Sequence, residues 1–146
     1  MRAIAIALVA LSAGCHFGGG GPQKEEARQV APFSAVQISG AIWLSATAGA
    51  PQSVKVKASA DLLSHVRTEV QGNVLHVYTQ GVSFSSAPVV TLTAPKLASI
   101  EASGATHIRA AGLDEDRLTL SVSGASNLAV TGKCKSLALE TSGASK

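Results

Sequence analysis

Residues 113–117 form the most acidic stretch of the chain, with three adjacent carboxylates at Asp114, Glu115 and Asp116. Adjacent carboxylates can attract Ca²⁺, but this spacing matches neither an EF-hand loop nor the glycine-aspartate repeats of calcium β-rolls. The stretch also follows Gly112 directly, where we expect a solvent-exposed turn. We therefore predict no calcium site here.

Three histidines are candidate metal ligands or bases, but they lie far apart in sequence, at positions 65, 76 and 107. No His-x-x-x-His or Cys-x-x-Cys pairing accompanies them, so a zinc site has little support. In the apolar run around His76, Leu75 and Val77 share one face, and a solvent-facing role accounts for the histidine. We expect no metal and no cofactor.

The main enzymatic alternative is a β-helix polysaccharide lyase or hydrolase. Glycoside hydrolysis needs two carboxylates roughly 5 to 9.5 Å apart, yet the aspartates are Asp61, Asp114 and Asp116, and the last two fall in one predicted turn. A nucleophilic serine would need a histidine base and an orienting carboxylate, and no Gly-x-Ser-x-Gly element is present. We therefore predict a protein that is not an enzyme.

The residue with the clearest chemistry is Cys15. Residues 1–14 combine one basic residue, an apolar run and small residues, which is the layout of a secretory signal peptide. The apolar run is about half the length of a transmembrane helix. Leu11-Ser12-Ala13-Gly14-Cys15 resembles the lipobox of bacterial lipoproteins, in which the cysteine thiol receives a diacylglycerol. We expect lipidation at Cys15 to anchor the protein in a membrane, with the outer membrane as the default because His16 follows the cysteine.

Composition excludes a further class of function. The formal net charge is only +3, and the basic residues are scattered rather than clustered. Aromatic residues make up 3% of the chain, too few for the stacking platforms of a single-strand nucleic-acid binder. We expect no nucleic-acid partner, and the same scarcity argues against aromatic sugar subsites.

The elements that must position any site are repeats of Ser-Gly-Ala centred on glycines. The last three central glycines are 20 and 19 residues apart. We predict structural corners at Gly40, Gly104, Gly124 and Gly143.

Apolar residues fall at even offsets around these glycines, for example Ile100, Ala102 and Ile108 around Gly104. Even offsets indicate strands with one inward face. The fold class we predict is all-β: a β-solenoid or β-helix-like stack of short strands with glycine corners and rungs of about 20 residues. The Ser and Thr hydroxyls of the corners should stack as ladders.

The same alignment bears on Cys134, whose lysine neighbours could lower the pKa of a thiol and make it reactive. Cys134 falls near Leu113 of the preceding rung, so we interpret it as an inward-facing small apolar residue. With Cys15 lipidated, it has no disulfide partner.

Less regular strands precede the repeats. Alternation continues at Val36, Ile38 and Leu44 and again at Val54 and Val56. Residues 59–63 suggest one helical turn with capping residues, 66–70 and 74–78 a pair of strands joined by a tight turn, and 89–93 another strand. Residues 15–32 are rich in glycine and charge and should form the lipidated cysteine and a flexible tether.

Together, residues 33–40, the segment from Ala60 to Val77 and the Ser-Gly-Ala-Ser repeats resemble the GIN-domain family, described as the head domain of auto-transporter adhesins. The resemblance covers about residues 33–146 and implies a β-helix-like, extracytoplasmic, often lipid-anchored protein without established enzyme activity. It brings no catalytic residues. The family's repeats normally run further, so the domain is a candidate for C-terminal truncation, and an open last rung could pair with a second copy or another partner.

The sequence thus predicts a lipid-anchored envelope protein that acts as a binding or adhesion module for a protein or glycan ligand. A periplasm-facing structural or regulatory lipoprotein that binds another envelope component remains the alternative.

Overall fold

Most strands of the domain have alternating apolar and polar residues. Successive side chains of a strand point to opposite faces, so the apolar residues are buried and the polar residues are exposed. The computed structural model describes residues 22–81 and 86–146, so the predicted signal peptide and Cys15 lie outside the described residues. Within that part the elements are β1 (Gln23–Arg28), β2 (Ala35–Ser39), β3 (Trp43–Ala48), β4 (Ser53–Ser59), α1 (Ala60–Leu63), β5 (Val66–Gln71), β6 (Val74–Thr79), β7 (Val89–Ala94), β8 (Ser99–Ser103), β9 (His107–Val122) and β10 (Asn127–Thr141).

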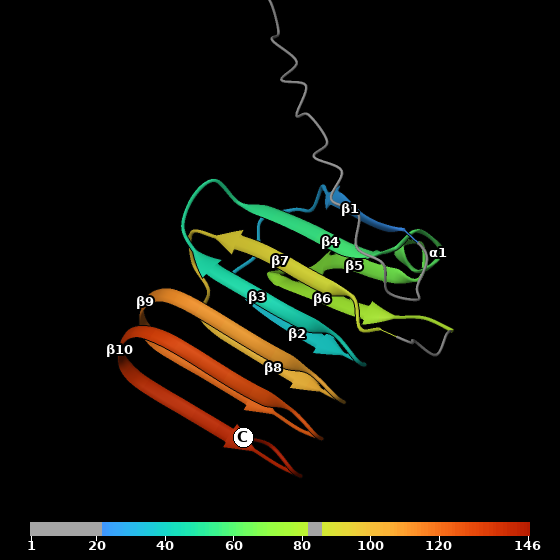
Figure 1. The fold of residues 1–146 in the computed structure, drawn as a ribbon. Coiled ribbons are helices and arrows are strands. Elements are labelled where there is room, and N and C mark those ends of the chain that lie inside the picture. The colour runs from blue at the N-terminus through green and yellow to red at the C-terminus, as the bar shows by residue number, and fades with distance from the viewer. Residues whose placement is uncertain (1–21, 82–85) are drawn as a thin grey trace, which may run out of the picture.

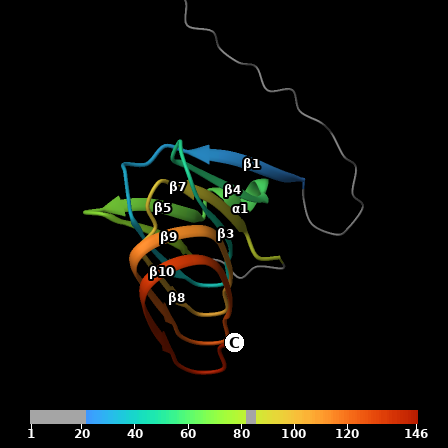
Figure 2. The same cartoon turned by 90° about the vertical axis from the view of Figure 1, so that its left-hand side faces the viewer.

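The described strands form one sheet in the order β1-β4-β7-β3-β9-β8-β2-β6-β5, with β10 paired to β9. The strand β9 is long and bent: its first part pairs with β3 and its last part with β8. The sheet therefore curls into a nearly closed, barrel-like form, and β9 and β10 curve around the interior (Figure 2). The predicted all-β class is confirmed.

Successive repeats lie on one another in parallel register. Ser39 pairs with Ser103, and the last part of β9 pairs with β8. Asn127 in turn pairs with His107 of the preceding repeat. At the other end of the molecule the pattern changes, because β5 joins β6 and β1 joins β4 in antiparallel pairs. These antiparallel pairs cover one end, and β10 forms the opposite end (Figure 1).

The core lies between the two sides of the curled sheet and consists mainly of Val, Ile, Leu and Ala. Val36, Ile38 and Val77 are at most 1% exposed, as alternation predicts. Each such side chain contributes about 1.5–3 kcal/mol when fully buried. The outward residues of the same strands are left free to contact solvent or a ligand.

Several local predictions are confirmed. The two strands around Gly72 are β5 and β6, and the strand after Pro88 is β7. The single helical turn is α1, although the N-cap residue Ser59 makes no side-chain capping hydrogen bond.

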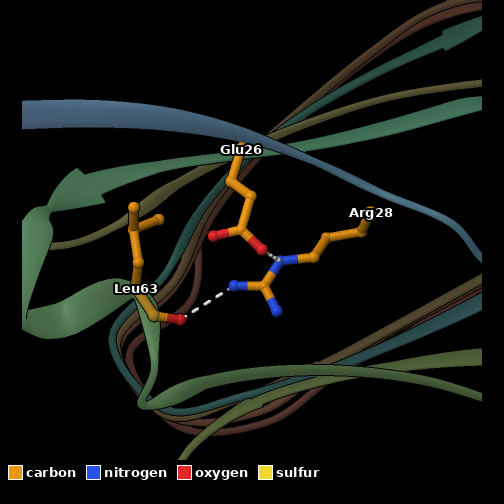
Figure 3. Close-up of polar contacts among 3 residues, drawn as sticks. All are labelled: Glu26, Arg28 and Leu63. Carbon is orange, nitrogen blue, oxygen red and sulfur yellow. Dashed lines mark hydrogen bonds and ion pairs between the residues drawn. The ribbon is translucent and has the colours of Figure 1, made fainter.

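The expected tether is wrong for part of its length, because Gln23–Arg28 form β1. This strand pairs along the whole of β4, so backbone hydrogen bonds order a sequence whose side chains are mostly exposed. Arg28 strengthens the attachment: its Nη2 donates a hydrogen bond to the Leu63 carbonyl at 2.8 Å (Figure 3). Its Nε lies 3.3 Å from Glu26 Oε1, close enough for an ion pair but without hydrogen-bond geometry.

Candidate functional site

The outward positions three residues after the corner glycines form a column across the sheet. Trp43 pairs with His107, and His107 pairs with Asn127. The Trp43 and His107 ring centroids are 5.0 Å apart with an interplanar angle of 58°. Asn127 Nδ2 lies 3.2 Å from His107 Nδ1. The Trp43 indole therefore contacts the His107 ring on one side. Because Trp43 is 52% exposed, the indole is still open to solvent.

A second outward row runs beside this column. Arg109 and Ser45 are register partners, and Ser45 also pairs with Thr91. Because side chains two residues apart on a strand share one face, Arg109 lies on the same face as His107. Within the described residues no carboxylate forms a salt bridge with Arg109. The guanidinium is therefore available to an anionic ligand.

Two lysines extend the positive charge along this face. Lys57 is the register partner of Val89, whose other neighbour is Trp43, and Lys55 pairs with Thr91. Lys55 Nζ is 3.3 Å from Glu25 Oε1, so one lysine is partly neutralised. We call the exposed residues Trp43, Ser45, Lys57, Thr91, His107, Arg109 and Asn127 the Trp43 face.

A hollow of about 320 Å³ adjoins the Trp43 face. Its lining consists of His107, Ile108, Arg109, Asn127, Leu128, Ala129 and Lys146. Guanidinium, ammonium, imidazole and amide groups can bind carboxylate, sulfate or hydroxyl oxygens. An indole at the rim offers a flat apolar surface. None of these lining side chains carries a carboxylate, and the groups present can bind the oxygen atoms of a ligand.

The edge of β10 is a second candidate surface. Within the described residues β10 pairs with β9 alone, and Leu137 and Leu139 are 54% and 57% exposed. A hollow of about 150 Å³ lies here, lined by Leu113, Leu118, Leu120, Val130, Gly132, Lys133, Cys134 and Leu137. Unpaired backbone groups beside exposed leucines can pair with another strand.

The four predicted corner glycines lie above one another with φ between +78° and +104°. A Cβ at Gly104 would lie 2.8 Å from the Gly40 carbonyl oxygen, and one at Gly124 would lie 2.5 Å from that of Gly104. Both distances are shorter than side chains tolerate, so this column excludes any residue larger than glycine. Gly143 approaches Gly124 in the same way, at 2.8 Å.

The predicted stacking of corner hydroxyls is confirmed for one pair, Thr106 and Ser126. The buried Thr106 hydroxyl donates to the buried Ser126 hydroxyl at 2.9 Å. Ser126 Oγ is also 3.1 Å from the Gly104 carbonyl oxygen. Ser145 Oγ is in turn 3.2 Å from the Gly124 carbonyl oxygen. The Ser126 and Ser145 hydroxyls thus lie within hydrogen-bond distance of backbone carbonyl groups at the corners, whereas burial is confined to Thr106 and Ser126.

The acidic residues 114–116 lie within β9, and two of their carboxylates contact different parts of the molecule. Glu115 Oε1 accepts a hydrogen bond from the Leu97 backbone N–H at 2.9 Å, and Asp116 Oδ1 is 2.8 Å from Lys135 Nζ. Residues 22–81 and 86–146 contain no group of three His, Cys, Asp or Glu side chains able to hold a metal ion. The chain bends at Gly112, which has φ of +70°, and Asp114 and Asp116 are exposed, as expected. The strand β9 continues through this bend, pairing with β3 before it and with β8 after it.

Cys134 is not buried, contrary to the expectation for an inward-facing apolar residue. Cys134 is exposed, and its register partner is Glu115, whereas Leu113 lies opposite Gly132. The alignment correctly placed Cys134 near Leu113, because both line the smaller hollow. It did not account for the position of β10 at the end of the sheet, where no described strand covers the thiol.

Trp43 was not predicted as a binding residue, because the low aromatic content of the chain argued against aromatic sugar subsites. Two signals in the sequence could have identified it. The buried residues Ile42 and Leu44 flank it, which places Trp43 outward by alternation. The same +3 offset from a corner glycine is occupied by His107 and Asn127, which predicts the column.

Residues 32–146 match the family model described as "Putative auto-transporter adhesin, head GIN domain", so the predicted family resemblance is confirmed. The strand β1 precedes the matched segment. No curated protein matches the chain in sequence. No helix in the described residues is long and apolar enough to cross a membrane.

Solved structures share the fold. A protein described as a putative adhesin from Parabacteroides merdae ATCC 43184 has a TM-score of 0.72 at 19% identity, covering 85% of this chain and 54% of that chain. A putative adhesin from Bacteroides fragilis NCTC 9343 has a TM-score of 0.70 at 18% identity, covering 85% and 60%. A putative lipid binding protein from Parabacteroides distasonis ATCC 8503 has a TM-score of 0.61 at 14% identity, covering 80% and 53%. The chain therefore spans little more than half the length of these structures.

Proposed function

The chain belongs to the head GIN domain family, and from that premise we propose that it is a non-catalytic binding module of the bacterial cell envelope, with adhesion as its role. The observation that carries the proposal is the Trp43 face. It presents an indole, an imidazole and a guanidinium that forms no salt bridge with a described carboxylate, and none of the residues named on this face is a carboxylate that could perform acid-base chemistry. The adhesin descriptions of the family and of two structural neighbours fit a binding role.

We propose that the repeats act as a short β-solenoid that keeps this face rigid. The support is the in-register stacking of Ser-Gly-Ala corners and the close approach of their glycines. A stacked framework positions outward side chains at fixed strand spacing, about 4.8 Å. A ligand would then meet a preorganised surface, which lowers the entropic cost of binding.

For membrane attachment we propose cleavage after residue 14 and lipidation of Cys15, followed by a tether leading to β1 and the domain at 33–146. The support is the lipobox-like sequence Leu11-Ser12-Ala13-Gly14-Cys15. Several acyl chains on one cysteine would hold the protein durably, since each buried methylene contributes about 0.8 kcal/mol. We place the protein in the outer membrane.

The experiment is labelled-palmitate incorporation and fractionation of cells that express the chain, followed by protease treatment of intact cells. We expect label and membrane association that disappear in Cys15→Ala, and digestion by external protease. A soluble, unlabelled wild-type protein would contradict the anchor. Protection of an anchored protein from external protease would contradict adhesion and favour the periplasm-facing alternative.

Self-association through β10 is a second proposal, supported by exposed Leu137 and Leu139 on a strand with one described neighbour. Two copies meeting antiparallel at this edge can place Leu137 of each opposite Leu139 of the other. Apolar cross-strand pairs of this kind stabilise a sheet. The experiment for this contact is given with the predictions below.

A further inference from the structure

We propose that the Trp43 face binds an anionic polysaccharide, meaning a glycan whose sugar rings carry carboxylate or sulfate groups. The proposal rests on the binding function proposed above and names the class of its ligand. It is argued from three properties of the face: a restrained aromatic ring, more positive than negative charge, and hydroxyl and amide groups between them.

The aromatic ring suits a sugar. Trp43 is the sole tryptophan of the chain and is half exposed on a sheet surface rather than buried in the core. A flat indole can cover the apolar C–H face of a pyranose while its N–H remains available to a hydroxyl. The contact with His107, at 5.0 Å between ring centroids, restrains the indole before binding. Less side-chain entropy is then lost when a ligand binds.

The charges indicate an anion. Arg109 forms no salt bridge with a described carboxylate, and Lys146 lines the adjoining hollow. Lys57 lies opposite Glu25 of β1, whose ion pair is with Lys55, so the two lysines share one carboxylate. Arg109 lies one strand over and two residues along from Trp43, roughly 8 Å between Cα atoms at standard strand dimensions. A ring stacked on Trp43 therefore places a charged group on its neighbour within reach of the guanidinium. Arginine binds carboxylate and sulfate oxygens with two parallel hydrogen bonds.

The remaining side chains favour a glycan over other polyanions. Ser45, Thr91 and Asn127 supply hydroxyl and amide groups for sugar hydroxyls. Single-stranded nucleic acid uses several aromatic rings in succession, whereas the described residues of this face include one Trp and no Phe or Tyr beside the His107 imidazole. A membrane surface would require several apolar side chains to insert, and the face has the indole alone.

The test is titration of the purified chain with oligogalacturonate and with heparin oligosaccharide, which carry carboxylate and sulfate groups respectively, and with neutral cello-oligosaccharide. Because Trp43 is the single tryptophan, its intrinsic fluorescence reports ligand binding at the Trp43 face. Calorimetry measures the affinity of the Trp43→Ala variant, which has no tryptophan. We expect an anionic glycan to change Trp43 emission and to bind more weakly as salt rises. Trp43→Ala and Arg109→Gln should each weaken binding at least about tenfold.

Arg67→Gln is the matched control, because Arg67 is an exposed arginine on β5, at the far end of the sheet order, and should leave affinity unchanged. Equal affinity for the neutral oligosaccharide, or unchanged affinity in Trp43→Ala, would overturn the proposal. So would equally tight binding to vesicles containing phosphatidylglycerol. If glycans fail to bind while cells expressing the chain still adhere to a surface, this inference fails and the binding function stands. If both fail, the proposed function fails too.

Discussion

Replacing Gly124 by alanine tests whether stacked corners hold the repeats together. Gly124 has φ of +87°, and an added Cβ would lie 2.5 Å from the Gly104 carbonyl oxygen and 3.1 Å from its nitrogen. A non-glycine residue in left-handed backbone costs about 1–2 kcal/mol. Overpacking against backbone that cannot move aside adds about 1–3 kcal/mol. We therefore expect Gly124→Ala to lower the free energy of unfolding by about 2–5 kcal/mol.

The matched control is Gly72→Ala in the turn between β5 and β6. Gly72 has φ of +63°, but nothing lies within 4 Å of its added Cβ. This variant carries the backbone cost without the contact, so we expect a loss of about 1–2 kcal/mol. The effect of alanine on the unfolded chain is similar at both sites and cancels in the comparison. The remaining difference, about 1–3 kcal/mol, measures the stacking contact.

Urea denaturation followed by Trp43 fluorescence and far-UV circular dichroism provides the assay. A domain of this size has a total stability of about 5–15 kcal/mol, so the difference between the two variants is measurable. An equal or smaller loss in Gly124→Ala than in Gly72→Ala would refute the reasoning, because Gly124 and Gly104 would then not be in close contact in solution.

Three further predictions concern single side chains. Leu139→Lys should abolish concentration-dependent association in sedimentation experiments, whereas Ser53→Lys on β4 should not; a wild-type chain that stays monomeric at high concentration would contradict the β10 contact. Thr106→Val should cost about 1 kcal/mol of stability by removing the hydrogen bond to Ser126, whereas Thr119→Val, on the exposed side of β9, should change little in the same denaturation assay. In the Cys15→Ala chain, Ellman's reagent should modify Cys134 as rapidly in native as in denaturing buffer; slow native reaction would mean that the thiol is covered.

Alternation of apolar and polar residues predicted most of the strands, because burial of one face requires an apolar residue at every second position. Val54 and Val56 of β4 and Val90 and Leu92 of β7 are all buried at the expected period of two. The strand β1 leaves no such trace. Its side chains are exposed along most of its length, and the strand exists because its backbone pairs with β4.

Sheet order could not be predicted from the repeats alone. The corner spacing accounts for the parallel stacking of β8, β9 and β10, but the antiparallel pairs β5-β6 and β1-β4 lie outside the regular repeats. Cys134 illustrates the same limit. Its offset matches an inward position, yet burial also requires a covering strand, and none of the described strands lies beyond β10.

The candidate site was derivable in part, because the glycine columns and the Trp43 column follow from one repeat. Because the repeats stack in register, the corner glycines contact one another, and this contact restricts the corner positions to glycine. The same spacing aligns residues at offset three on the outer surface, where Trp43, His107 and Asn127 differ in chemistry without disturbing the stack. Core packing therefore constrains the inward and corner positions and leaves the outward columns free to vary. Since a binding function has to be built on positions that can change without unfolding the domain, the outer columns are where ligand specificity is expected.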